Sequence, residues 1–230
     1  MCLKPPLMGK TGPMVGELRT DYHRGLEEIN RLLTQMIASV EDAISAASAA
    51  VLSSDDEAAQ HVVLRGQTIE ELHQSVEALV FSQLARQAPV GGDLRYLVAA
   101  LRIVPELELT RNLAGDLARR GNMRLGAELS PRVRGLVANM FDQSLAMWRQ
   151  VANAFAERLP EAARLLESED DNLEEIYLVL TAELAAGLLR PPVLLEMALV
   201  ARFLKRLGDH AVESAKWVAS FSGPGGRGAL

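Results

Sequence analysis

Two segments of this chain repeat each other 97 positions apart, and this repeat constrains the fold more than any other feature. The segments are residues 107–119 and 204–216, in which leucines, alanines and the final basic residue match in register. Two matched pairs differ in charge: Glu108 stands against Lys205, and Asn112 against Asp209. A repeat of this kind in a chain of 230 residues predicts two similar halves.

The composition and the spacing of apolar residues favour helices. Hydrophobic residues make up 49% of the chain but aromatic residues only 4%, which suits close-packed helices better than sheets. From Leu26 to Ala50, apolar residues recur at steps of three and four, which is typical of a long helix in a left-handed, coiled-coil-like bundle. We therefore predict an all-α fold of two tandem three-helix bundles related by internal duplication.

Signals for helix starts divide the chain further. Ser53–Glu57 offers an N-cap followed by acidic residues, Asp93 follows a turn that contains proline and glycine, and Ser130 precedes a proline. These signals, together with proline and glycine at both ends of the chain, predict four parts. They are a flexible N-terminal extension (1–15), a first three-helix unit (16–121), a second three-helix unit (130–221) and a disordered tail (222–230).

The charge balance and the cysteine content exclude several classes of protein. A net charge of -6 and a pI near 5.3 give no electrostatic attraction to phosphate backbones, so we predict no nucleic-acid binding. No uncharged apolar run approaches the roughly 20 residues that span a bilayer, so we predict no membrane insertion. The single cysteine, Cys2, forms neither an internal disulfide nor a thiolate zinc site, which favours a reducing, cytoplasmic compartment.

Polar side chains form a stripe on each repeated helix, because residues four apart share a helix face. One interpretation is a solvated surface with weak pairs within the helix, such as Lys205 with Asp209. A second is a site for a hard cation, at which these carboxylates meet those of a neighbouring helix. The acidic residues of the two stripes are the candidate metal ligands: Glu108, Asp116, Asp209 and Glu213. Neutral Asn112 and cationic Lys205 interrupt the stripes, so we expect no cofactor, with a divalent metal ion or iron as the alternative.

The middle helix of each half adds chemistry of its own. It offers acidic partners to the stripes: Glu70, Glu71, Asp170, Asp171, Glu174 and Glu175. Glu70 and His73 form one Glu-x-x-His unit of the kind found in di-iron bundles, but the second unit that such sites need is missing. His210 lies beside Asp209 and suggests phosphotransfer, yet a lone histidine on a packed helix is more often a hydrogen-bonded core residue. We predict that the protein is not an enzyme.

Three segments resemble one family. They are Arg19–His23 followed by Leu26, then Gln87–Arg95 with its Gln-Ala-Pro-Val turn, and Arg202–Ala211. These segments are similar to the signature segments of the PhoU family of phosphate-uptake regulators. The resemblance extends from about residue 18 to residue 218.

The resemblance implies a cytoplasmic, non-enzymatic adaptor, held at the inner face of the membrane through its partners. It would bind the ATPase subunit of the phosphate ABC transporter and a sensor histidine kinase, form a homodimer, and act as a negative regulator of phosphate-starvation signalling. Members of the family often carry Glu/Asp-x-x-x-Asp on the last helix of each half, where metal clusters bind. Asn112 and Lys205 depart from that pattern. The alternative function is a carboxylate-rich bundle that binds or stores metal ions, with or without metalloenzyme activity.

Overall fold

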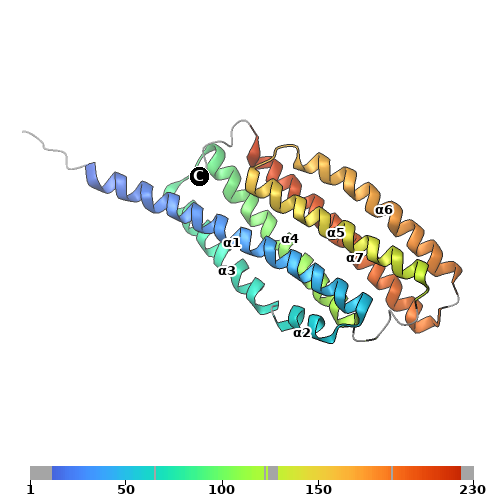
Figure 1. Cartoon of the computed structure of the whole chain (residues 1–230). Coiled ribbons are helices and arrows are strands. Elements are labelled where there is room, and N and C mark those ends of the chain that lie inside the picture. Colours follow the sequence, from blue (N-terminus) through green and yellow to red (C-terminus); the bar gives the residue numbers. More distant parts are fainter. Residues whose placement is uncertain (1–11, 65, 122, 124–128, 188, 224–230) are drawn as a thin grey trace, which may run out of the picture.

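The computed structural model describes residues 12–64, 66–121, 123, 129–187 and 189–223, and these residues form helices and no strand (Figure 1). The predicted all-α class is therefore confirmed. Residues 1–11 and 224–230, which hold most of the predicted extension and tail, lie outside the described ranges. The helices are α1 (Gly12–Ser53), α2 (Asp56–Leu64), α3 (Gly66–Gln87), α4 (Gly91–Gly121), α5 (Pro131–Glu157), α6 (Ala162–Ala186) and α7 (Pro191–Ser222).

Two of the three helix starts agree with the capping signals in the sequence, whereas α4 begins at Gly91, so Asp93 lies within its first turn. Asp55 Oδ1 accepts hydrogen bonds from the backbone N–H groups of Glu57 (3.0 Å) and Ala58 (2.9 Å) at the start of α2. Ser130 Oγ accepts one from the backbone N–H of Val133 at 3.2 Å, at the start of α5. Each side-chain oxygen satisfies donors that the first turn of a helix leaves open.

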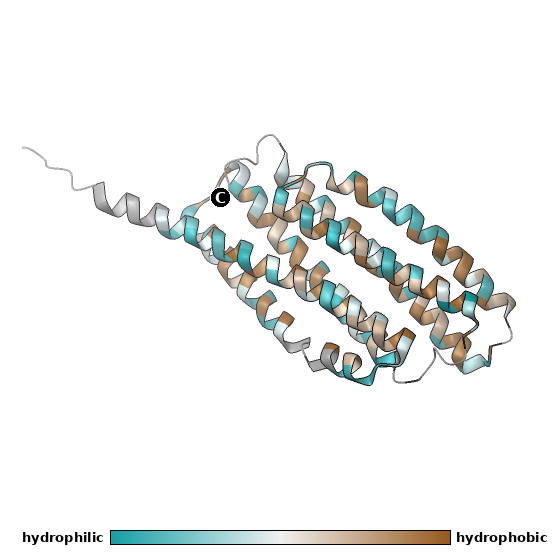
Figure 2. Cartoon of the chain, viewed as in Figure 1, coloured by the Kyte–Doolittle hydropathy of each residue, from teal (hydrophilic) through white to brown (hydrophobic). Residues whose placement is uncertain are grey.

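Helix α1 supplies the longest side of the core. Its apolar residues at steps of three and four are buried, as the heptad pattern predicts, and α1 packs against both α4 and α5. The helix begins at Gly12, inside the range predicted as a flexible extension. Figure 2 shows hydrophobic and hydrophilic residues alternating along each helix, as expected where one face is buried and the other is exposed.

Part of α1 also meets a simple criterion for a membrane span. The segment Thr20–Ser53 is long enough, and over an 18-residue window apolar enough, to cross a bilayer. Counting only uncharged runs in the sequence misses this segment. Within that window 44% of the residues are buried in the protein, and the core helix of a bundle passes the same test.

The two halves pack side by side through pairs of antiparallel helices. Helix α4 of the first half lies along α7 of the second, and α1 lies along α5 (Figure 1). The start of α4 meets the end of α7, where the rings of Tyr96 and Phe221 pack edge to face at 5.3 Å. At the other end, Arg120 pairs with Glu196 at 3.0 Å. Helices α2 and α3 lie on one side of this central layer and α6 on the other, so the repeated helices α4 and α7 meet in the centre.

The middle helix differs between the halves. The sequence predicts one helix here, but the first half has α2 and α3 on either side of residue 65, whereas α6 runs without interruption. Arg111 on α4 donates a buried hydrogen bond to the carbonyl of Val62, in the last turn of α2, which satisfies a group that a helix end leaves open. The residue that corresponds to Arg111 on α7 is Gly208, and α6 packs so closely there that a Cβ would overlap Leu173.

Candidate functional site

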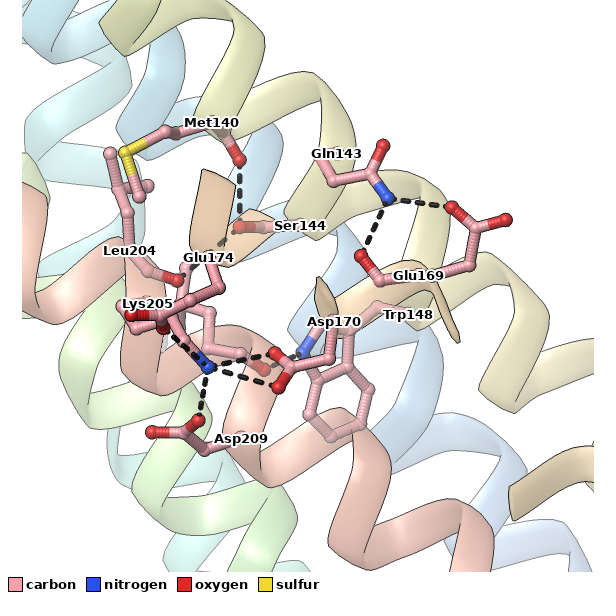
Figure 3. Close-up of polar contacts among 11 residues, drawn as sticks. Met140, Gln143, Ser144, Trp148, Glu169, Asp170, Glu174, Leu204, Lys205 and Asp209 are labelled. Carbon is pink, nitrogen blue, oxygen red and sulfur yellow. Dashed lines mark hydrogen bonds and ion pairs between the residues drawn. The ribbon is translucent and has the colours of Figure 1, made fainter. Parts of the chain in front are cut away.

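Lys205, on α7, is a charged residue in the buried interior of the described part of the chain. It is only 6% exposed, and its ammonium lies between α6 and α7 (Figure 3). Nζ donates hydrogen bonds to both oxygens of Asp170, at 2.9 and 3.0 Å, and to Oδ1 of Asp209 at 2.7 Å. Glu174 Oε2 lies 3.5 Å from the same nitrogen. We call these four residues the Lys205 cluster.

The cluster keeps its lysine charged. Burial by itself lowers the pKa of Lys205, because it removes water from the ammonium. Hydrogen bonds and Coulomb attraction from Asp209 and Asp170 act in the opposite direction, and the pKa of Lys205 is raised overall. The ammonium therefore stays protonated at neutral pH, and it neutralises part of the negative charge gathered around it.

Helix α5 holds the backbone of α7 on both sides of Lys205. The indole N–H of Trp148, which is fully buried, donates to the carbonyl of Leu207 at 3.0 Å. The hydroxyl of Ser144 lies 3.4 Å from the carbonyl of Leu204 and 2.7 Å from that of Met140 (Figure 3). These hydrogen bonds fix the position of α7, so the lysine points towards α6.

The first half has an acid–base pair at the equivalent position, Glu108 with His73, but the helices that carry the acid and the base are exchanged. Glu108, which corresponds to Lys205, accepts a hydrogen bond from Nδ1 of His73 on α3. His73 Nε2 lies 3.4 Å from Glu77. Thus in the first half the acid is on the repeated helix and the base on the middle helix. In the second half the base is on α7, together with Asp209, and the two facing acids are on α6. Asn112, the counterpart of Asp209, is exposed.

The structure does not bring the four predicted metal ligands together. Glu108 pairs with His73, Asp116 with Arg119, Asp209 with Lys205, and Glu213 with Lys216. No group of three or more histidine, cysteine, aspartate or glutamate residues with metal-binding geometry occurs among the described residues. In the second half the ammonium of Lys205 occupies the point on which the carboxylates converge. The residues present therefore do not fit the metal clusters that the family pattern implies.

Of the acidic residues predicted on the middle helices, two reach the repeated helix. Asp170 and Glu174 contact Lys205, whereas the others are exposed: Glu70, Glu71, Asp171 and Glu175. The interpretation of the α7 stripe as a solvated surface is wrong at Lys205, because α6 packs directly over it. The Lys205–Asp209 pair does form, but as one part of a contact between helices.

A second set of polar contacts joins the two halves. His210 Nδ1 on α7 lies 2.6 Å from Oε2 of Glu106 on α4, so the interpretation of His210 as a hydrogen-bonded core residue fits this geometry. The other ring nitrogen of His210 is buried and has no hydrogen-bond partner within the described residues. Arg120 also lies over the ring of Phe203, 4.7 Å from its centroid. Nothing in the local sequence pairs Glu106 with His210, because 104 positions separate them.

The raised pKa of Lys205 leads to a prediction at alkaline pH. Its contribution to stability is complete below the unfolded-chain pKa of about 10.4 and is lost as the pH rises through the folded-state pKa. We expect the urea midpoint of the unmodified chain to fall more steeply above about pH 10.4 than that of Lys205→Met. Burial also raises the pKa of Tyr96, but this phenol titrates in both proteins and cancels in the comparison. Equal slopes in the two proteins would contradict the prediction.

Comparisons with known proteins agree on one family. The PhoU domain model matches residues 33–120 and 137–218, one match in each half. The chain is 30% identical over 204 residues to "Phosphate-specific transport system accessory protein PhoU homolog 1" of Mycobacterium tuberculosis, covering 87% of this chain and 92% of that protein. It is 22% identical over 201 residues to the PhoU homolog of Rhizobium meliloti, covering 86% of this chain and 85% of that protein.

Solved structures show the same fold. The crystal structure of PhoU from Pseudomonas aeruginosa matches with a TM-score of 0.81 and 25% identity, covering 87% of this chain and 98% of that one. The phosphate transport system regulatory protein PhoU from Streptococcus pneumoniae matches with a TM-score of 0.76 and 18% identity, over 87% and 96% of the two chains. The second match bears on the fold alone.

Proposed function

The chain belongs to the PhoU family, and from this premise we propose that it is an adaptor that restrains phosphate uptake and phosphate-starvation signalling. A regulatory role in phosphate uptake is what the family supports directly. The finer proposal is that the chain binds the ATPase subunit of the phosphate transporter and a sensor histidine kinase. It would do so as a homodimer in the cytoplasm, held at the inner face of the membrane by these partners.

One observation supports the proposal above the others. Both halves match the family model, and the match to the mycobacterial relative covers nearly the whole of both chains. The similarity therefore includes the tandem arrangement as well as a single helical motif. Two linked bundles present long helix faces, and such faces recognise partners through stripes of complementary side chains.

We infer that apolar surfaces are better candidates for partner binding than charged ones. Many charges on α4 and α7 are paired within the chain, as in the Lys205 cluster and in the Glu106–His210 contact. By contrast, three large apolar residues are exposed around the start of α4: Val90, Leu94 and Val98. Leu94 and Val98 are four residues apart, so they share one face of the helix. We propose this apolar strip as a contact surface for one of the partners.

Co-purification from cells tests the adaptor proposal. The tagged chain is recovered from phosphate-replete and phosphate-starved cells, and the bound proteins are identified by mass spectrometry. We expect the ATPase subunit and the kinase to be recovered from phosphate-replete cells, and a strain that lacks the chain to express its phosphate-starvation genes constitutively. Association with neither partner at any phosphate level, together with normal repression in that strain, would refute the proposal.

A pair of surface variants tests the apolar strip. Replacing Leu94 and Val98 with glutamate is expected to weaken partner binding roughly tenfold or more, because a residue at the centre of an interface contributes about 2 kcal/mol. The matched control replaces Leu178 and Val179, which are exposed on α6, with glutamate. Equal loss of binding in both variants would argue against the strip as the contact surface.

A further inference from the structure

We propose that Lys205 is a built-in cation: its ammonium takes the place of a divalent metal ion between α6 and α7, so the second half neither needs nor admits a metal there. This inference concerns the chain itself and is independent of its partners.

Oxygen atoms of three carboxylates surround the ammonium of Lys205. Asp170 and Glu174 come from α6 and Asp209 from α7, and their oxygens lie 2.7–3.5 Å from one nitrogen. Hard cations such as Mg²⁺ and Ca²⁺ are also bound by several carboxylate oxygens, but at shorter distances of about 2.0–2.6 Å. Here Nζ occupies the point of convergence. Its distances to the oxygens of Asp170 and Asp209 are those of N–H···O hydrogen bonds, and Glu174 at 3.5 Å makes an ion-pair contact.

The positive charge of Lys205 offsets the repulsion among these carboxylates. Three carboxylates would repel one another across the α6–α7 contact if no positive charge lay between them. Lys205 supplies that charge from within the chain, and its side chain is 8% exposed, so few water molecules screen the attraction. Because the ammonium is covalently attached, it cannot dissociate when the supply of metal ions falls.

The internal repeat shows that the lysine belongs to the second half alone. At the position of Lys205 the first half has Glu108, so the lysine is a property of the second half and the duplication does not require it. The first half satisfies Glu108 differently, with the imidazole of His73 on α3. In each half a basic nitrogen of the chain thus lies against a carboxylate of the facing helix, but the helices that supply acid and base are exchanged.

Removing the ammonium should convert the cluster into a cation site. The purified full-length chain and Lys205→Ala are compared by thermal unfolding in EDTA and in millimolar Mn²⁺ or Mg²⁺. We expect the midpoint of the unmodified chain to be the same in EDTA and in Mn²⁺. For Lys205→Ala we expect a midpoint about 5 °C lower in EDTA, and recovery of most of this loss in Mn²⁺.

Two companion variants make the comparison specific. Lys216→Ala removes a half-exposed lysine of the same helix, which pairs with Glu213 at 3.6 Å and Glu167 at 3.9 Å, and it should give no metal response. Adding Asp170→Asn and Asp209→Asn to Lys205→Ala should abolish the response, because only one of the three carboxylates, Glu174, is then left to attract a cation.

Direct metal measurement decides the outcome. Elemental analysis after gel filtration in Mn²⁺ should find more metal in Lys205→Ala than in the unmodified chain. If Lys205→Ala does not fold in either buffer, Lys205→Gln, which keeps a hydrogen-bond donor of similar size, takes its place. The proposal is overturned if the folded variant shows no response to Mn²⁺, or if the unmodified chain is itself stabilised by Mn²⁺ in a manner that Asp170→Asn removes.

Discussion

Trp148→Ala is expected to lower the free energy of unfolding by about 4 kcal/mol, which is one of the two largest losses that we anticipate from a single substitution. Trp148 is fully buried on α5, so its removal leaves a large cavity between α5 and α7. Its indole N–H also donates to the carbonyl of Leu207, and this hydrogen bond between α5 and α7 would be lost. Because this hydrogen bond lies close to Lys205, the variant should also loosen the Lys205 cluster.

Urea unfolding, followed by circular dichroism, measures this loss. Trp148→Phe keeps most of the volume but lacks the N–H group, so it should lose less, about 1–2 kcal/mol. Trp217→Ala is the matched control, because Trp217 is a tryptophan on α7 that is only partly buried, with Arg102 lying over its ring at 5.6 Å. If Trp217→Ala lost as much unfolding free energy as Trp148→Ala, the burial of Trp148 between α5 and α7 would not explain its contribution to stability.

Gly121→Ala is expected to be the second most damaging change, with a loss of about 2–3 kcal/mol. Gly121 ends α4 where this helix passes close to α1. A Cβ at this position would lie 2.5 Å from the backbone carbon and oxygen of Ala50 and 2.8 Å from its Cβ. Since backbone atoms cannot rotate away as a side chain can, the two helices would have to separate.

The same helix provides the control. At Gly115 a Cβ would meet only the side chains of Arg111 and Arg119, at 3.5 and 3.6 Å, which are ordinary contact distances. Gly115→Ala should therefore raise stability by about 0.5–1 kcal/mol, because alanine loses less backbone freedom in a helix interior. Thermal unfolding of the two variants side by side tests the argument. Destabilisation of both by the same amount would contradict it.

Much of the fold could be predicted because helices are specified by local patterns. The apolar steps in α1 predict which of its faces is buried. The predicted start signals in Ser53–Glu57 and at Ser130 contain the two caps that the structure shows, Asp55 and Ser130. The match between the repeats also predicts two related halves. Each of these features depends on residues within a few turns of one another.

The break between α2 and α3 could not be predicted in this way. The capping pattern predicts a single helix, and the end of α2 involves Arg111, which is 49 positions from Val62. Comparing the two repeats does give one sign that the middle helices differ, because Arg111 corresponds to Gly208. A large side chain in one half and none in the other indicates that the middle helices cannot pack equally closely.

The candidate site, too, has features that local sequence predicts and features that depend on tertiary packing. The sequence by itself determined the helical class, the repeat and the exchange of Glu108 for Lys205, because these depend on residue identity and on spacing along one helix. It also determined that Lys205 and Asp209 are one turn apart. Only the tertiary structure decided that Lys205 is buried, because burial depends on α6 packing over α7, and Asp170 reaches the ammonium from 35 positions away. The energy of a charge is set by the groups and the solvent around it in space, so neighbours along the chain could not reveal that this lysine lies among three carboxylates.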